Sequence, residues 1–87
     1  MARASSFIGG TEQGDSVTFW YRNSYSGKTT EISAHVTENE RGLWVQLESA
    51  DGTDWKIFGN EVSDREEGAV FKDDRKNGEF LGYEVQE

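Results

Sequence analysis

The sequence predicts an all-β domain, a small barrel of five to six short antiparallel strands. Three observations favour this fold: period-2 alternation of apolar and polar residues, turn residues between the alternating runs, and no helix-period pattern of useful length. A barrel is favoured over a sandwich because a chain of 87 residues leaves less strand edge exposed when its sheet closes.

The first half of the chain contains two alternating runs joined by a polar turn. The alternation begins at Ser16 and continues through residue 22, and it resumes over residues 30–37 after the turn sequence of residues 23–28. We predict that residues 1–14 form a flexible N-terminal lead-in and that residues 15–87 form a single small β-barrel domain.

The second half contains four further runs and two hairpin signals. Residues 38–42 are a polar break. Asp51-Gly52 and Asn77-Gly78 are dipeptides that favour tight turns needing positive φ. The strands expected here are 43–47, 55–59, 69–72 and 79–86.

One phase of the strands is apolar and predicts the core. We expect Trp55 in particular to be largely buried, because it alternates in phase with Ile57. The full set of predicted core residues is Val17, Phe19, Tyr21, Ile32, Ala34, Val36, Leu43, Val45, Leu47, Trp55, Ile57, Leu81, Tyr83 and Val85.

The opposite phase interleaves aromatic residues with a few cations and predicts a binding face. Such a surface stacks bases in oligonucleotide-binding barrels or anchors a protein partner. The alternative is structural burial, because strongly bent strands can bury both phases; Phe58 and Phe80 also lie in this phase. The candidate binding residues are Trp20, Arg22, Tyr25, His35, Trp44 and Lys56.

The order of strands and turns resembles that of known small barrels. A strand, a Gly-Lys turn and a strand are followed by Leu-Glu-Ser-Ala-Asp-Gly-Thr-Asp-Trp-Lys-Ile and then Val62. Over residues 16–62 this layout resembles the middle of SH3-like and Sm-like barrels. The resemblance implies a module that contacts RNA, DNA or protein.

Several kinds of chemistry are excluded or disfavoured by composition. The chain has no cysteine and one histidine, so disulfides, thiolate nucleophiles and a two-histidine metal site within one chain are excluded. Ser26-Gly27-Lys28-Thr29 is not a P-loop, because the glycine required five positions earlier is Arg22. The acidic cluster of residues 73–79 lacks EF-hand spacing. We therefore expect no catalytic residue, no metal, no cofactor and no enzymatic activity.

The charge is the strongest compositional feature. Seventeen acidic residues against nine basic ones give a net charge of −8, which opposes binding to bare nucleic acid or an anionic membrane at ordinary salt. Dispersed acids with few lysines resemble the proteins of salt-accumulating halophilic microbes, in whose cytoplasm the charge is screened; the alternative is an ordinary acidic protein of a mesophile. With no signal peptide or membrane-spanning run in the sequence, we expect a cytoplasmic protein-interaction or assembly module with no membrane partner. A nucleic-acid-binding module at high salt is the alternative.

Overall fold

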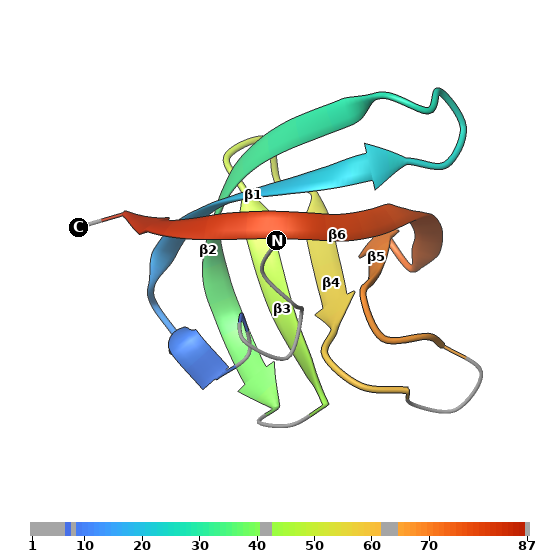
Figure 1. The fold of residues 1–87 in the computed structure, drawn as a ribbon. Helices are drawn as coiled ribbons and strands as arrows, with labels where there is room; N and C mark the ends of the chain where they lie inside the picture. The colour runs from blue at the N-terminus through green and yellow to red at the C-terminus, as the bar shows by residue number, and fades with distance from the viewer. Residues whose placement is uncertain (1–6, 8, 41–42, 62–64, 87) are drawn as a thin grey trace.

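The computed structural model describes residues 7, 9–40, 43–61 and 65–86, which form a closed antiparallel barrel of six strands (Figure 1). Each strand pairs with the next along the chain, and β6 pairs with β1 to close the barrel. The predicted all-β class and the small antiparallel barrel are confirmed. The strands are β1 (Ser16–Asn23), β2 (Thr29–Glu40), β3 (Trp44–Ser49), β4 (Asp54–Phe58), β5 (Ala69–Lys72) and β6 (Arg75–Gln86).

Alternate residues of the strands fill the core, as the period-2 pattern predicts. Trp55 is 3% exposed, and its ring centroid lies 5.5 Å from those of both Phe19 and Tyr21. The predicted core residues that are buried are Val17, Phe19, Tyr21, Ala34, Val36, Val45, Leu47, Trp55 and Ile57. Ile32 and Tyr83 pack against this core and are partly buried.

The predicted phase of β6 is wrong near its middle because the strand contains a bulge. Trp20 pairs with Gly82 and Tyr21 with Phe80, so Leu81 has no partner on β1. The extra residue turns Phe80 into the core and leaves Leu81 half-buried.

Two further residues of the predicted core lie near the ends of strands and are exposed. Leu43, just before β3, is 44% exposed, and Val85, at the end of β6, is 36% exposed. At these positions the neighbouring strands no longer enclose the inward face, so alternation alone overestimates burial.

β2 is longer than the alternation predicts, continuing to Glu40 through the first part of the expected polar break. Its pairing with β3 shifts between Val36 and Glu38, which leaves Thr37 as an extra residue. The Thr37 hydroxyl donates to the Gln46 carbonyl at 3.2 Å across the two strands. This bulge lets a polar sequence remain paired past the point where its alternation ends.

The turn between β5 and β6 lies at Asp73-Asp74 and not at Asn77-Gly78. Asp73 and Asp74 have φ values of 48° and 67°, as a two-residue type I′ hairpin requires. Asn77 and Gly78 lie inside β6, where a pairing shift produces a second bulge on that strand.

The sequence predicts a flexible lead-in over residues 1–14, of which residues 1–6 and 8 lie outside the described ranges; the described part of this segment packs against the barrel. Phe7 is fully buried, and its ring stacks on Phe80 at a centroid distance of 5.3 Å. The Thr11 hydroxyl donates to the Phe7 carbonyl, and the Asn39 side chain donates to the Thr11 carbonyl near the end of β2. This segment therefore covers one end of the barrel. No helix within the described ranges is long and apolar enough to cross a membrane.

Candidate functional site

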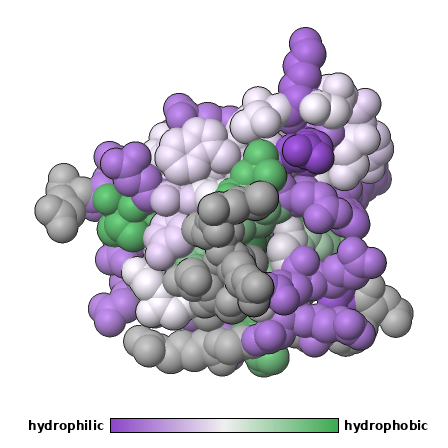
Figure 2. Space-filling model, viewed as in Figure 1, coloured by the Kyte–Doolittle hydropathy of each residue, from purple (hydrophilic) through white to green (hydrophobic). Residues whose placement is uncertain are grey.

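The six residues predicted as one binding face are distributed around the barrel. Five of them lie on the outer face of β1, β2, β3 or β4, and Tyr25 lies in the β1–β2 turn. Most of the surface in Figure 2 is hydrophilic, and its apolar residues form small separate patches.

Trp20 lies half-buried on the outer face of β1 beside a carboxylate. Its Nε1 donates to Oε1 of Glu31 on β2 at 2.9 Å. On the other side it pairs with Gly82 of β6, and a Cβ at that glycine would lie 3.9 Å from the indole ring. Arg22 follows on the same face and is exposed. A carboxylate bonded to the indole opposes the approach of a phosphate to this aromatic residue.

Trp44 and Lys56 form a second group on the outer face of β3 and β4. The Lys56 ammonium lies 4.3 Å from the Trp44 ring centroid, a cation–π contact. Phe58, which pairs with Trp44, is only 3% exposed, and Phe71 packs edge-on against it at a centroid distance of 5.3 Å. For Phe58 the alternative prediction of structural burial is therefore confirmed.

Trp20 and Trp44 do not form a common platform. Their partners on β2 are Glu31 and Glu40, near opposite ends of that strand. At about 3.3 Å per residue these partners are roughly 30 Å apart along the strand. One short run of stacked bases therefore cannot use both indoles.

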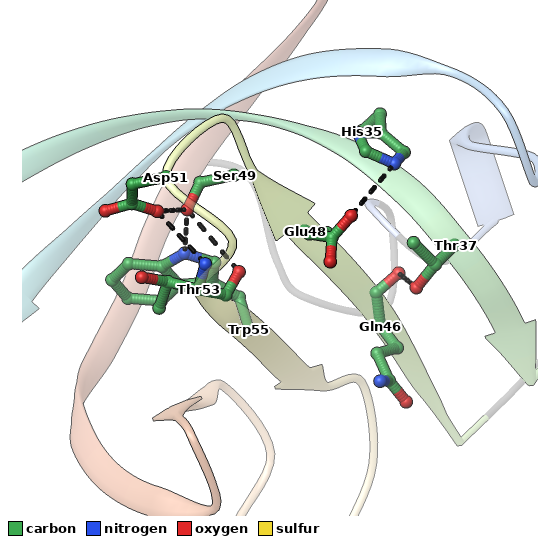
Figure 3. A network of polar contacts seen from close by, with 8 residues as sticks. All are labelled: His35, Thr37, Gln46, Glu48, Ser49, Asp51, Thr53 and Trp55. Atoms are coloured by element: carbon green, nitrogen blue, oxygen red, sulfur yellow. Dashed lines mark hydrogen bonds and ion pairs between the residues drawn. The ribbon is translucent and has the colours of Figure 1, made fainter.

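Tyr25 and His35 are also separate from these groups. Tyr25 is 78% exposed in the β1–β2 turn, and its hydroxyl donates to the Lys76 carbonyl at 3.3 Å. His35 is exposed on the outer face of β2, with Nε2 3.8 Å from Oε1 of Glu48 on β3 (Figure 3). The predicted binding set is therefore divided among several sites.

The structure instead shows a hollow of about 540 Å³ at one open end of the barrel, which we name the barrel-end hollow. Every one of the six strands contributes to its lining. The partly buried Ile32 provides apolar surface, the nearly buried Tyr21 and Trp55 lie beneath it, and the remaining lining is mainly hydrogen-bonding side chains. The lining residues are Tyr21, Asn23, Thr30, Glu31, Ile32, Ser33, Ser49, Ala50, Asp51, Trp55, Lys72 and Asn77.

The β3–β4 turn forms one wall of the hollow and is fixed by a hydrogen-bond network (Figure 3). Asp51 Oδ1 accepts bonds from the Ser49 hydroxyl and, at 3.0 Å, from the Thr53 amide. Trp55 Nε1 donates to the Ser49 Oγ at 3.1 Å. The Ser49 hydroxyl bond, with those from Thr53, lowers the pKa of Asp51 to about 2. The wall therefore carries a fixed negative charge at neutral pH.

Few charged side chains lie on the walls of the hollow. Asp51 provides a carboxylate and Lys72 an ammonium group, whereas Glu31, which also borders the hollow, accepts the Trp20 indole N–H with its carboxylate on the outer face. The Lys72 ammonium lies 5.6 Å from the Trp55 ring centroid. A second hollow, of about 520 Å³, adjoins the first at Lys72 and Asn77 and is bordered by Tyr25 and Arg75.

Sequence reasoning missed the barrel-end hollow because its residues come from the ends of strands. Tyr21, Ile32 and Trp55 were correctly placed in the inward phase, but alternation does not show which inward residues lie at an open end. The signal that could have located it is the polar residues, such as Ser49 and Asn77, that adjoin the apolar runs at that end.

The described residues contain no group of three or more His, Asp or Glu side chains placed to hold a metal ion. No protein-family model, curated protein or solved structure matches this chain.

Proposed function

We propose that this chain is a non-enzymatic protein-interaction module that binds its partner in the barrel-end hollow. The observation that carries the proposal is the difference between the two ends of the barrel. The segment containing Phe7 and Thr11 covers one end, while the other presents apolar surface within a hydrogen-bonding rim. A concave apolar surface with a few polar groups is typical of a recognition site.

The chemistry of the hollow supports binding over catalysis. The Ser49 hydroxyl, which lines the hollow, donates to the Asp51 carboxylate. A general base works best with a pKa near the working pH, whereas the pKa of Asp51 is about 2. His35, the only histidine, lies on the outer face of β2 and is not part of the lining. The Ser49–Asp51 pair is therefore suited to holding the turn and not to acid–base catalysis.

A protein partner is supported over a nucleic acid by the placement of the aromatic residues. The indole of Trp20 is bonded to Glu31, and Trp44 lies near the other end of β2. Asp51 lies on the wall of the hollow and the Glu31 carboxylate lies on the outer face beside it, and these charges, with the net charge of −8, oppose phosphate.

A photo-crosslinking amino acid at position 30 tests the proposal, because Thr30 is half-buried and lines the hollow. In extract from the source cells we expect a discrete protein adduct that resists nuclease treatment. The same amino acid at position 84 is the matched control, because Glu84 is exposed on β6 and is not among the lining residues.

The captured protein, once purified, must bind the unmodified chain. We expect Ile32→Ala to weaken that binding about tenfold, which is about 1.4 kcal/mol, while Leu81→Ala removes a similar side chain outside the hollow and leaves binding unchanged. Thermal unfolding of both variants verifies that each is folded. Equal crosslinking at positions 30 and 84, or an adduct destroyed by nuclease, would contradict a protein partner in the hollow.

A further inference from the structure

The free edge of β2 beside the barrel-end hollow indicates how a partner would bind. We infer that the partner adds an antiparallel β-strand to β2 at residues 29–33, with a basic side chain opposite Glu31 and apolar side chains entering the hollow. This inference rests on the proposed function, because the added strand occupies the same hollow.

Pairing of β2 with its two neighbours is staggered, and this leaves part of one edge open. β2 pairs with β1 from Thr29 to His35, but its pairing with β3 begins only at Ala34. Residues 29–33 therefore have no strand on the β3 side among the described residues. The open length is about 16 Å, and Figure 1 shows the β1–β2 hairpin extending beyond the rest of the barrel.

The backbone groups of Glu31 point to this open edge. Val36 donates its N–H to the Asp15 carbonyl and accepts from the Gly14 N–H, both at 2.8 Å and both on the β1 side. Backbone groups of alternate residues point to the same edge, and the β1–β2 register is regular from Thr29 to His35. The N–H and C=O of Thr29 and Glu31 therefore point away from β1, where an added strand can bond to them.

The side chains along this edge specify an alternating partner. Thr30 and Ile32 pair with the inward residues Tyr21 and Phe19, so they face the hollow. Glu31 lies on the outer face and is exposed. Directly opposed side chains of an antiparallel pair interact, so a Lys or Arg opposite Glu31 is favoured, with apolar neighbours entering the hollow.

A second copy of this chain fits the edge less well than a basic partner. Antiparallel self-pairing over all of residues 29–33 would place Glu31 opposite Glu31, and like charges directly opposed are destabilising. Each copy also carries a net charge of −8. Glu31 therefore protects the edge against self-association, a common use of charge on edge strands, while favouring a cationic strand.

The test uses the capped peptide Arg-Val-Arg-Val-Arg, titrated into the full chain at about 0.15 M ionic strength and followed by NMR. We expect shifts at Ile32 and the Trp55 indole, and slower exchange of the Glu31 amide. N-methylation of the central arginine should weaken binding at least about tenfold, because that residue exchanges both backbone bonds with Glu31. N-methylation of the valines is the matched control, because their N–H groups point away from β2.

Glu31→Gln keeps an oxygen acceptor for the Trp20 indole while removing the charge. This substitution should reduce the affinity for the arginine peptide several-fold. Equal binding by the two kinds of N-methylated peptide would overturn strand addition while leaving the hollow as the site. A chain that is dimeric in sedimentation, and that the peptide converts to monomer, would assign the edge to a second copy. If a protein partner crosslinks at position 30 but hydrogen exchange of the Glu31 amide is not slowed when that partner binds, strand addition is overturned while the proposed function stands.

Discussion

Asp51 shows how a single side chain gives the hollow a rigid wall. Its carboxylate accepts bonds from Ser49 and Thr53 across the β3–β4 turn, and Ser49 in turn accepts the indole N–H of Trp55. Gly52 takes the positive φ of 83° that the predicted Asp-Gly turn requires. A hydrogen bond thus joins the turn to a core aromatic residue, so the wall of the hollow is held in place by the barrel core.

The lowered pKa of Asp51 predicts a specific acid sensitivity. A carboxyl whose pKa falls from 3.8 to about 2 on folding stabilises the fold fully above the unfolded pKa and loses that contribution as pH falls toward 2. We expect the melting temperature of the native chain to fall more steeply between about pH 4 and pH 2 than that of Asp51→Asn. Asp54→Asn removes a carboxylate close to the same turn and serves as the control. Parallel curves for the native chain and Asp51→Asn would contradict the network.

At the scale of elements, the β5–β6 hairpin shows how tertiary pairing overrides a local turn signal. Asn77-Gly78 is the stronger hairpin dipeptide, yet the turn lies at Asp73-Asp74. Gly78 instead meets the β1 backbone closely, since a Cβ there would lie 2.0 Å from the Arg22 carbonyl oxygen. The glycine is required for close approach of two strands rather than for the turn.

This assignment predicts opposite effects of two substitutions. Asp74→Gly should stabilise the fold by up to about 1 kcal/mol, because a left-handed conformation is costly for residues with a side chain and not for glycine. Gly78→Ala should strongly destabilise or unfold the chain, because its Cβ would overlap the Arg22 backbone. Chemical denaturation measures both. A tolerated Gly78→Ala combined with a destabilising Asp74→Gly would place the turn at Asn77-Gly78 instead.

The same elements show how much of the molecule the sequence can predict. Alternation identifies the inward faces of β1, β3 and β4, and the Asp51-Gly52 turn is correctly located. The bulges on β2 and β6 are not visible in a period-2 pattern. The pattern therefore predicts Leu81 in the core, whereas the bulge on β6 places Phe80 there. The barrel-end hollow depends on how far the strands are staggered, which local sequence does not encode.

For the whole molecule, the dominant property is a charge of −8 on a body measuring 31 × 27 × 25 Å. Some carboxylates lie close together. A side-chain hydrogen bond with Glu38, desolvation and repulsion by Glu38 together raise the pKa of Glu40. A raised carboxyl pKa means that the folded state disfavours the charged form, so this pair opposes folding at neutral pH.

Salt should therefore stabilise the fold, which is also what a halophilic source, a prediction from the sequence, would require. At 0.01 M ionic strength the Debye length is about 30 Å, comparable with the molecule, whereas at 1 M it is about 3 Å. We expect the melting temperature, followed by circular dichroism at pH 7, to rise as KCl increases over this range, because carboxylate repulsion is screened.

Glu40→Gln should raise the melting temperature in dilute salt and reduce its dependence on KCl, since it removes one member of the repelling pair. His35→Gln, which removes no carboxylate, should leave that dependence unchanged. A melting temperature independent of KCl in all three proteins would show that repulsion does not limit stability, and the high-salt adaptation would lose its physical basis.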